Sequence, residues 1–237
     1  MHSADLKINP WRHGQAFTLI EMLVVIAIMS ILMTAGAIGL GGMGGKGVTS
    51  GVASAESLFD EARSIAVGQR TKARVLIAKD LTNNPADNLR RILVASAEID
   101  PLTGLEKSPS NWILSSRGVV LPDQTYFSQE FSLKDQKSAG GGIDVMSSLD
   151  GAKAAYAGSY YYYEFNAEGI CTTPGAGFVI GAGTRAVNKP TSKPRVTSTA
   201  KRDFGGFVIW RNGRTSIFRS PAQIASSIQS LNPGATF

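Results

Sequence analysis

The longest apolar stretch of the chain lies near its beginning, over residues 17–40, and Glu21 is its one charged residue. Apolar side chains would occupy every face of a helix built from this stretch, which suits lipid or a tightly packed bundle. At 1.5 Å per residue, such a helix of about 24 residues extends about 36 Å, enough to cross a bilayer core of about 30 Å. The pattern therefore predicts a single-pass transmembrane helix that follows a short polar leader, residues 1–16.

The leader carries Lys7 and Arg12, and positive charges before a span keep that end in the cytoplasm. Three interpretations remain open for the apolar stretch: a signal anchor, a cleaved secretory signal, or an assembly segment in which the glutamate is functional. Residues 35–37, Ala-Gly-Ala, have the small side chains of a secretory cleavage site. However, the apolar region of a secretory signal is usually about 7–15 residues long, and a central glutamate would be out of place in it.

Glu21 needs a partner if this stretch enters a membrane. A carboxylate in a membrane span costs about 2.5–3.5 kcal/mol on insertion scales, so such acids normally pair with another group. Cleavage before Phe17 would create an α-amino cation in the same apolar zone. Pairing of Glu21 with the amino group of a neighbouring subunit would neutralise both charges and set the stagger between subunits.

The sequence of residues 16–28, AFTLIEMLVVIAI, resembles the class III signal of type IV pilins and type II secretion pseudopilins. The resemblance implies that a prepilin peptidase cuts between Ala16 and Phe17 and methylates the new amino terminus. Glu21 then occupies the place of the family's fifth mature residue. The family usually has glycine before the cut, so Ala16 implies slower processing. Gly14 cannot replace it, because cleavage there would make Glu21 the seventh residue.

The same resemblance implies the location and the partners of the chain. The protein would insert in the inner membrane with its C-terminal domain in the periplasm. It would then join other pilin or pseudopilin subunits in a filament that can reach the cell surface.

Residues 41–53 are rich in glycine, and the stretch 39–51 contains seven glycines. Glycine costs about 1 kcal/mol relative to alanine inside a helix, so this segment is predicted to be melted or kinked. It would serve as a flexible linker, or, as the family resemblance implies, as a part of the helix that loses order on assembly.

Residues 54–237 are predicted to form one globular domain. A helix over 54–69 has an apolar stripe at spacings of three and four, and Ser54 is its expected N-cap. Short strands alternate with turns after it, and Asn212-Gly213 is a strong hairpin signal. The predicted fold class is α+β, with the helix laid on an antiparallel β-sheet. The strands are expected at 72–78, 90–96, 111–116, 126–133, 160–165, 178–180, 207–210 and 215–218, with a short helix at 221–231.

Three pieces of this domain resemble the GspH/FimT group of minor pseudopilins. They are Glu61–Ala66 followed by a strand, Tyr163–Gly169, and the final hairpin at Asn212-Gly213-Arg214. Between the first and last of them lies the run Tyr160–Tyr163, whose side chains alternate along a strand. Two of its rings are expected to enter the core, and two to face outward or meet a neighbouring subunit.

Composition argues against enzymatic activity. The only two histidines, His2 and His13, lie in the leader, so the processed chain would lack the commonest general base and metal ligand. No catalytic or phosphate-loop motif is present, and neither a metal ion nor a cofactor is expected. Cys171 is the single cysteine. It is interpreted as a buried thiol and not as a nucleophile.

Two basic features stand out against a net charge of +6. Residues 184–202 contain six cations, two prolines and no acid, which is typical of a solvated mobile loop. The alternative is a polyanion-binding arm for DNA or an acidic polysaccharide. The candidate contacts in this arm are Lys189, Lys193 and Arg195.

The second basic feature is the C-terminal hairpin, with Arg211, Arg214 and Arg219. Resemblance to pilin-like proteins that bind DNA during uptake implies a DNA-binding role for these arginines. The alternative is that they are ordinary surface residues or ion-pair partners.

Overall fold

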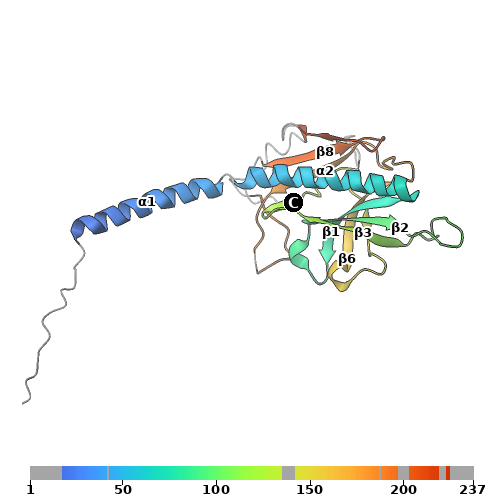
Figure 1. Ribbon diagram of the computed structural model, residues 1–237, viewed down its shortest axis with the longest axis horizontal. Coiled ribbons are helices and arrows are strands. Elements are labelled where there is room, and N and C mark those ends of the chain that lie inside the picture. The colour runs from blue at the N-terminus through green and yellow to red at the C-terminus, as the bar shows by residue number, and fades with distance from the viewer. Residues whose placement is uncertain are drawn as a thin grey trace, which may run out of the picture. The chain divides into compact units, whose positions relative to one another are not determined.

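The computed structural model describes residues 18–41, 43–134, 142–186, 188–196, 203–218 and 223–224 (Figure 1). The chain divides into two compact units, residues 1–41 and residues 42–237. Each unit is described by itself below.

The first unit contributes helix α1, Leu19–Gly41. Ten large apolar side chains of its first part are between 45% and 86% exposed. They are Leu19, Ile20, Met22, Leu23, Val24, Val25, Ile26, Ile28, Met29 and Leu32. Within the part of the chain that the structure describes, no helix is long and apolar enough to cross a membrane.

The second unit begins with the long helix α2, Met43–Gln69, and continues with short strands and two single-turn 3₁₀-helices. The strands are β1 (Ala73–Leu81), β2 (Arg91–Ala97), β3 (Trp112–Val120), β4 (Thr125–Phe127), β5 (Val145–Met146), β6 (Gly158–Phe165), β7 (Ala176–Ala182), β8 (Phe204–Ile209) and β9 (Thr215–Ile217). The 3₁₀-helices are η1 (Pro85–Asp87) and η2 (Ala154–Tyr156).

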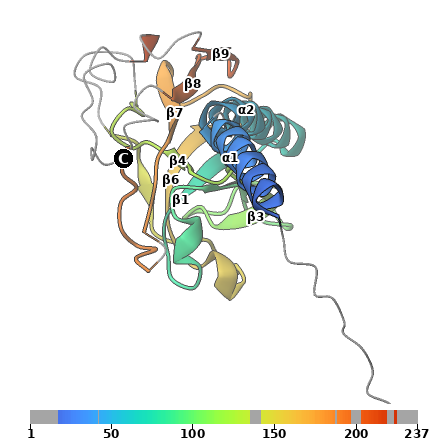
Figure 2. The ribbon, with the colours of Figure 1, turned by 90° about the vertical axis from the view of Figure 1, so that its left-hand side faces the viewer.

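These strands form two antiparallel sheets, not the single sheet predicted. One sheet has the order β3-β2-β1-β6-β5, and the other has the order β4-β7-β8-β9. In both ribbon views β8 lies above α2 and β1 lies below it, so the helix is inserted between the sheets (Figures 1 and 2). The predicted α+β class, with a long helix packed on antiparallel strands, is confirmed.

Phe59 of α2 is the centre of the main core. Its side chain is fully buried, and its ring meets four other rings edge-on at centroid distances of 5.0–6.3 Å. Tyr163 and Phe165 come from the first sheet, and Phe178 and Phe207 come from the second. Such aromatic pairs contribute about 0.5–1.5 kcal/mol each beyond the area they bury. The helix therefore joins the two sheets through one aromatic cluster.

The prediction that the glycine-rich segment is melted is wrong over residues 43–51, which are helical in α2. The alternative prediction of a kink is not tested, because Gly42, between α1 and α2, lies outside the described residues. Val48 and Val52 are buried there, and each buried valine contributes about 1.5–3 kcal/mol, more than a glycine costs. A Cβ atom at Gly51 would lie only 2.8 Å from Cδ1 of Ile180. The absence of a side chain at Gly51 therefore allows α2 to approach the second sheet closely.

The predicted apolar stripe of α2 is confirmed, because Leu58, Ala62 and Ala66 are buried and Ile65 packs against the same core. The predicted N-cap at Ser54 is wrong, since α2 begins at Met43. The carbonyl of Ser54 instead accepts a hydrogen bond of 2.8 Å from the Ser57 hydroxyl within the helix.

The outer face of the first sheet carries a second hydrophobic cluster that the sequence did not predict. Tyr160 is fully buried in it, beside Leu149 from the segment between β5 and β6, and Tyr162 is partly buried against it. Tyr161 and Tyr163 face the main core. The expected alternation is confirmed, because two rings enter the main core and two lie on the other face of the sheet. The expectation that both of the latter face outward or meet a neighbouring subunit is wrong for Tyr160, because the second cluster covers it.

The remaining strand predictions differ mainly at their ends. The strand expected at 126–133 is only Thr125–Phe127, because the Ser128 hydroxyl accepts a hydrogen bond from the backbone N–H of Phe131 and bends the chain. Strand β5 was not predicted. Most of the helix expected at 221–231 lies outside the described residues.

Candidate functional site

Helix α1 begins with a reciprocal capping arrangement between Thr18 and Glu21. The backbone N–H and the hydroxyl of Thr18 both donate to Oε2 of Glu21, each at 3.0 Å. The backbone N–H of Glu21 donates in turn to the Thr18 hydroxyl at 3.3 Å. The first helical hydrogen bond runs from the N–H of Met22 to the Thr18 carbonyl at 3.3 Å. Thr18 is therefore the N-cap, and Glu21 closes a capping box.

This capping role of Glu21 was missed in the sequence analysis. The Thr-x-x-Glu spacing of residues 18–21 is itself the signal for a capping box, and it lies directly before an apolar run. The predicted processing residues, Ala16 and Phe17, lie outside the described residues. The Glu21 carboxylate therefore accepts a backbone hydrogen bond from Thr18, the residue directly after the predicted new N-terminus at Phe17.

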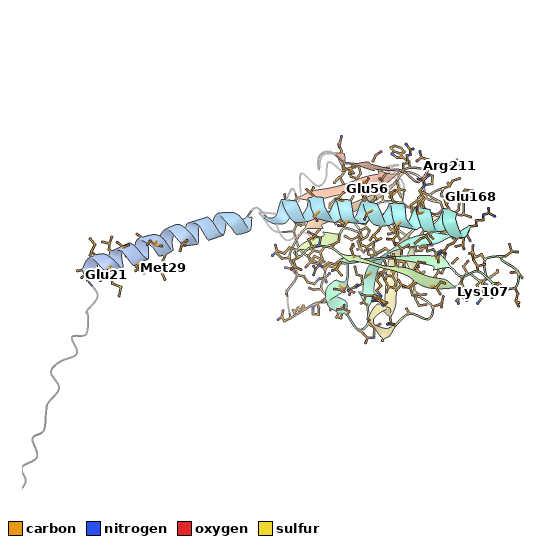
Figure 3. All side chains as sticks on the ribbon, in the orientation of Figure 1. Glu21, Met29, Glu56, Lys107, Glu168 and Arg211 are labelled. Carbon is orange, nitrogen blue, oxygen red and sulfur yellow. The ribbon has the colours of Figure 1, made fainter. Side chains whose placement is uncertain are left out.

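Among the described residues of the first unit, nothing covers the exposed apolar side chains of α1. Figure 3 shows Met29 and the side chains around Glu21 extending from several sides of the helix. Exposed apolar surface of this extent marks contact with lipid or with another protein. The segment is therefore an interaction element.

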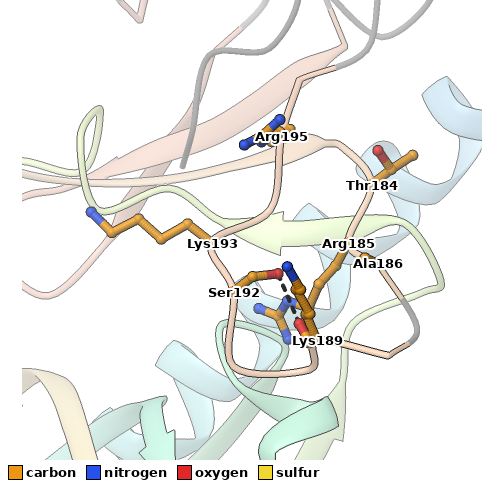
Figure 4. Close-up of a pocket in the computed structure, with 7 residues that line it drawn as sticks. All are labelled: Thr184, Arg185, Ala186, Lys189, Ser192, Lys193 and Arg195. Carbon is orange, nitrogen blue, oxygen red and sulfur yellow. Dashed lines mark hydrogen bonds between the residues drawn. The ribbon is translucent and has the colours of Figure 1, made fainter.

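The loop after β7 surrounds a hollow of about 540 Å³, which we call the basic hollow. It is lined by Thr184, Arg185, Ala186, Lys189, Ser192, Lys193 and Arg195 (Figure 4). The structure thus brings together the three loop cations predicted from the sequence and adds a fourth, Arg185. With the other described residues, none of these four side chains forms an ion pair.

Arg185 is anchored, unlike the cation of a solvated loop. Its guanidinium donates to the carbonyl of Asn88 at 2.8 Å and lies 4.9 Å from the ring centroid of Tyr126. Burial lowers the pKa of this guanidinium from its usual value, although an arginine stays charged at neutral pH. Thr184 and Arg195 exchange two backbone hydrogen bonds of 2.8 Å. The described part of the loop is therefore a folded element.

The hairpin arginines occupy a different place. Arg211 and Arg214 are exposed in the turn between β8 and β9, where Gly213 has a φ of 76°. The predicted hairpin turn is confirmed, and Figure 3 places Arg211 near Glu168 at the C-terminal end of α2. Neither arginine lines the basic hollow. Arg219 lies outside the described residues.

Cys171 is 1% exposed, and burial raises the pKa of its thiol. The thiol also donates to the carbonyl of Thr173 at 3.4 Å. A buried thiol with a raised pKa is a poor nucleophile, in agreement with the prediction. Among the described residues, no three His, Cys, Asp or Glu side chains are grouped so that they could hold a metal ion.

Comparison with known families gives one match, over the N-terminal segment. Residues 11–37 match the family described as the prokaryotic N-terminal methylation motif. This range contains Ala16, Phe17 and Glu21. The match covers the region of the capping box and the exposed part of α1, and it does not extend into the second unit.

Two further comparisons add little. No curated protein sequence matches the chain. Among solved structures, the chain is similar to the type IV minor pilin FimU of Pseudomonas aeruginosa, with 16% identity and a TM-score of 0.33. That likeness covers 73% of this chain and 94% of the other, and it is too low to carry an argument about function.

Proposed function

We propose that the chain is a structural subunit, a minor pilin or pseudopilin, of a type IV pilus or a type II secretion filament. The observation that carries this proposal is the exposed apolar surface of α1, in a segment that matches the methylation motif. An apolar helix joined to a separate globular unit is suited to membrane storage before assembly and to helix packing afterwards. The role is structural, and no catalytic step is assigned.

Processing and assembly follow from this proposal. A prepilin peptidase cuts between Ala16 and Phe17 and methylates the new amino group. The subunit is held in the inner membrane by residues 17–40, with the globular unit in the periplasm. During assembly, Glu21 pairs with the amino terminus of a neighbouring subunit.

The test is expression of the full chain with and without a prepilin peptidase, followed by mass spectrometry of the intact protein. The expected product begins at Phe17 and carries one added methyl group, and it forms only when the peptidase is present. An unchanged N-terminus would indicate a plain signal anchor. Cleavage after Ala37 would indicate a secretory signal.

A second candidate function is capture of DNA or an acidic polysaccharide. The basic hollow favours it, because Lys189, Lys193 and Arg195 line one cavity. The hairpin arginines, Arg211 and Arg214, stay a separate prediction. Salt-dependent binding of an anionic polymer by the purified chain tests this function.

A further inference from the structure

We propose that the basic hollow binds a linear ligand that carries several phosphate groups. The proposal rests on the second candidate function and names its ligand class. It does not depend on filament assembly, because every residue of the hollow belongs to the second unit.

The charge of the lining argues for an anion. Arg185, Lys189, Lys193 and Arg195 surround the cavity, and its lining contains no carboxylate. Like charges repel each other, and carboxylates elsewhere on the second unit offset many of its cations, as Glu106 does for Lys72 at 3.1 Å. A set of four cations around one cavity is the arrangement that a bound anion would neutralise.

The backbone of the loop is ordered before any ligand arrives, and Arg185 is anchored, while the side chains of Lys189, Lys193 and Arg195 are exposed. Two successive turns shape it, because Lys189 donates its N–H to Ala186 and Ser192 donates its N–H to Lys189, each at 3.0 Å. The Ser192 hydroxyl also donates to the Lys189 carbonyl at 2.7 Å. Ordering the loop therefore adds little to the cost of binding, which favours affinity.

The size of the cavity and its surroundings indicate an extended ligand. A volume of about 540 Å³ exceeds that of one small ion by several fold. A second hollow of about 290 Å³ adjoins it, sharing Arg185, Ser192 and Lys193 and adding Lys79. Lys193 extends to the side away from Thr184 in Figure 4. Asp80 also lines the second hollow, and its Oδ1 accepts a hydrogen bond of 3.4 Å from Asn88.

Phosphate is the anion that best matches this charge density. A terminal phosphate monoester carries a charge of about −1.5 to −2 at pH 7. Each phosphate that links two units of a chain carries one negative charge, so a short linear chain presents several charges in a row to the cations of the loop. Both arginine and lysine bind phosphate, arginine through paired N–H donors and lysine as a point charge. No aromatic side chain lines the larger hollow, so its contacts would be to phosphate groups, which carry no sequence information. Tyr161 lines the adjoining hollow.

The experiment uses the full chain in a non-ionic detergent and measures binding at several salt concentrations. The probes are inorganic phosphate, tripolyphosphate, a short oligothymidylate and a heparin fragment. The loop variant is Lys189→Gln/Lys193→Gln/Arg195→Gln. The control variant, Arg70→Gln/Arg117→Gln/Lys153→Gln, removes the same charge from exposed positions outside both hollows and outside the hairpin.

The wild-type chain should bind tripolyphosphate or oligothymidylate more tightly than inorganic phosphate. The loop variant should bind roughly tenfold more weakly, and its salt slope should fall by about 2. The control should stay within about twofold of the wild type. Binding of tripolyphosphate alone would indicate a free oligophosphate, and binding of the oligonucleotide alone would indicate a nucleic acid backbone.

Several results would overturn the proposal. An equal loss in the loop variant and the control would show a general charge effect. A larger loss in a third variant, Arg211→Gln/Arg214→Gln, would place the site at the hairpin. Heparin binding through the loop, without phosphate binding, would keep the second candidate function but reject the phosphate class. A thermal midpoint measured for each variant shows whether a loss of binding reflects unfolding.

Discussion

The carboxylate of Glu21 accepts two hydrogen bonds of 3.0 Å from Thr18, one from its backbone N–H and one from its hydroxyl. Glu21 thus stabilises the first turn of α1 in the isolated chain, without a neighbouring subunit. The predicted pairing with an amino terminus requires its negative charge, whereas the capping role requires only an acceptor. These two roles can be separated by substitution.

Glu21→Gln should impair filament assembly while α1 stays helical. Glutamine can also close a capping box, but it has no charge to pair with an amino group. Glu21→Ala loses both functions and should also weaken the first turn, by about 1 kcal/mol. Assembly is measured as the amount of sheared filaments, and helix content is measured by circular dichroism.

The matched controls are at Thr18. Thr18→Ser keeps the N-cap and should assemble normally, whereas Thr18→Ala weakens the cap but keeps the Glu21 charge. If Glu21→Gln assembles as well as the wild type, capping alone explains Glu21, and the charge-pairing mechanism is wrong.

Ala16→Gly should speed processing. Glycine is the usual residue before the cut in the pilin family that this segment resembles, and it adds no Cβ to the peptidase site. The measurement is the fraction of chain that begins at Phe17 at successive times after synthesis, with Gly14→Ala as the control. Equal rates for Ala16→Gly and the wild type would show that alanine there is no obstacle.

Gly51→Ala should destabilise the second unit by about 1–2 kcal/mol. The added methyl would lie 2.8 Å from Cδ1 of Ile180 and 3.3 Å from Cδ2 of Leu121, so a packed core must shift. The free energy of unfolding is measured by urea denaturation, with tryptophan fluorescence as the signal that reports unfolding.

Two variants make the Gly51 test specific. Gly68→Ala should be neutral or stabilising by up to about 1 kcal/mol, because a Cβ there meets nothing within 4 Å. Ile180→Val removes the clashing Cδ1 and should lower the cost of Gly51→Ala in the double variant. Equal effects of Gly51→Ala and Gly68→Ala would contradict close packing of α2 on the second sheet.

Glu164→Gln should destabilise the chain by about 1–3 kcal/mol. Arg74 lies opposite Glu164 in the first sheet, with an ion-pair distance of 2.7 Å, and both side chains are 15% exposed. The Arg74 guanidinium is also held between the rings of Trp112 and Tyr162, at 3.8 and 3.9 Å from their centroids. Loss of the carboxylate therefore leaves a partly buried cation.

A double-mutant cycle with Arg74→Met isolates this pair. Methionine keeps most of the side-chain volume without the charge. The double variant should be more stable than the sum of the two single changes predicts. Strict additivity would show that Glu164 and Arg74 do not interact in solution.

Alkaline pH should unfold the protein through its buried tyrosines. Burial raises the pKa of Tyr160 to about 12 and raises that of Tyr163 well above its usual value. The neutral form is favoured in the folded chain, so this contribution is constant below pH 10. It falls as pH rises from 10 to 12, because only the unfolded chain ionises there.

Tyr160→Phe should flatten this alkaline decline, by about 2–3 kcal/mol between pH 10 and pH 12. The variant also loses the hydrogen bond from the Tyr160 hydroxyl to the Tyr156 carbonyl, which lowers stability equally at all lower pH values. Burial also raises the pKa of the Cys171 thiol, so Cys171→Ala is the control for an effect in the same direction. An unchanged slope in Tyr160→Phe would contradict the assignment to Tyr160.

The sequence was most informative where the pattern is local. The apolar stripe of α2, the turn at Asn212-Gly213 and the centres of most strands follow from spacing and turn chemistry, which involve only neighbouring residues. The strand ends were less predictable, as at Ser128, where a side-chain hydrogen bond bends the chain. The Thr18–Glu21 capping box also has a local signal, the Thr-x-x-Glu spacing directly before an apolar run.

By itself, the sequence determined the apolar helix with its single carboxylate, the α+β class and the gathering of cations after residue 184. These are matters of composition and period. Only the tertiary structure decided that the glycine-rich segment is helical, because Val48 and Val52 are buried there and Gly51 lies close to Ile180. The tertiary structure likewise placed Arg185 beside Asn88 and Tyr126 and arranged the cations of the loop around one cavity. Contacts between residues so far apart in the chain have no local signature, because they depend on how α2 and the two sheets pack.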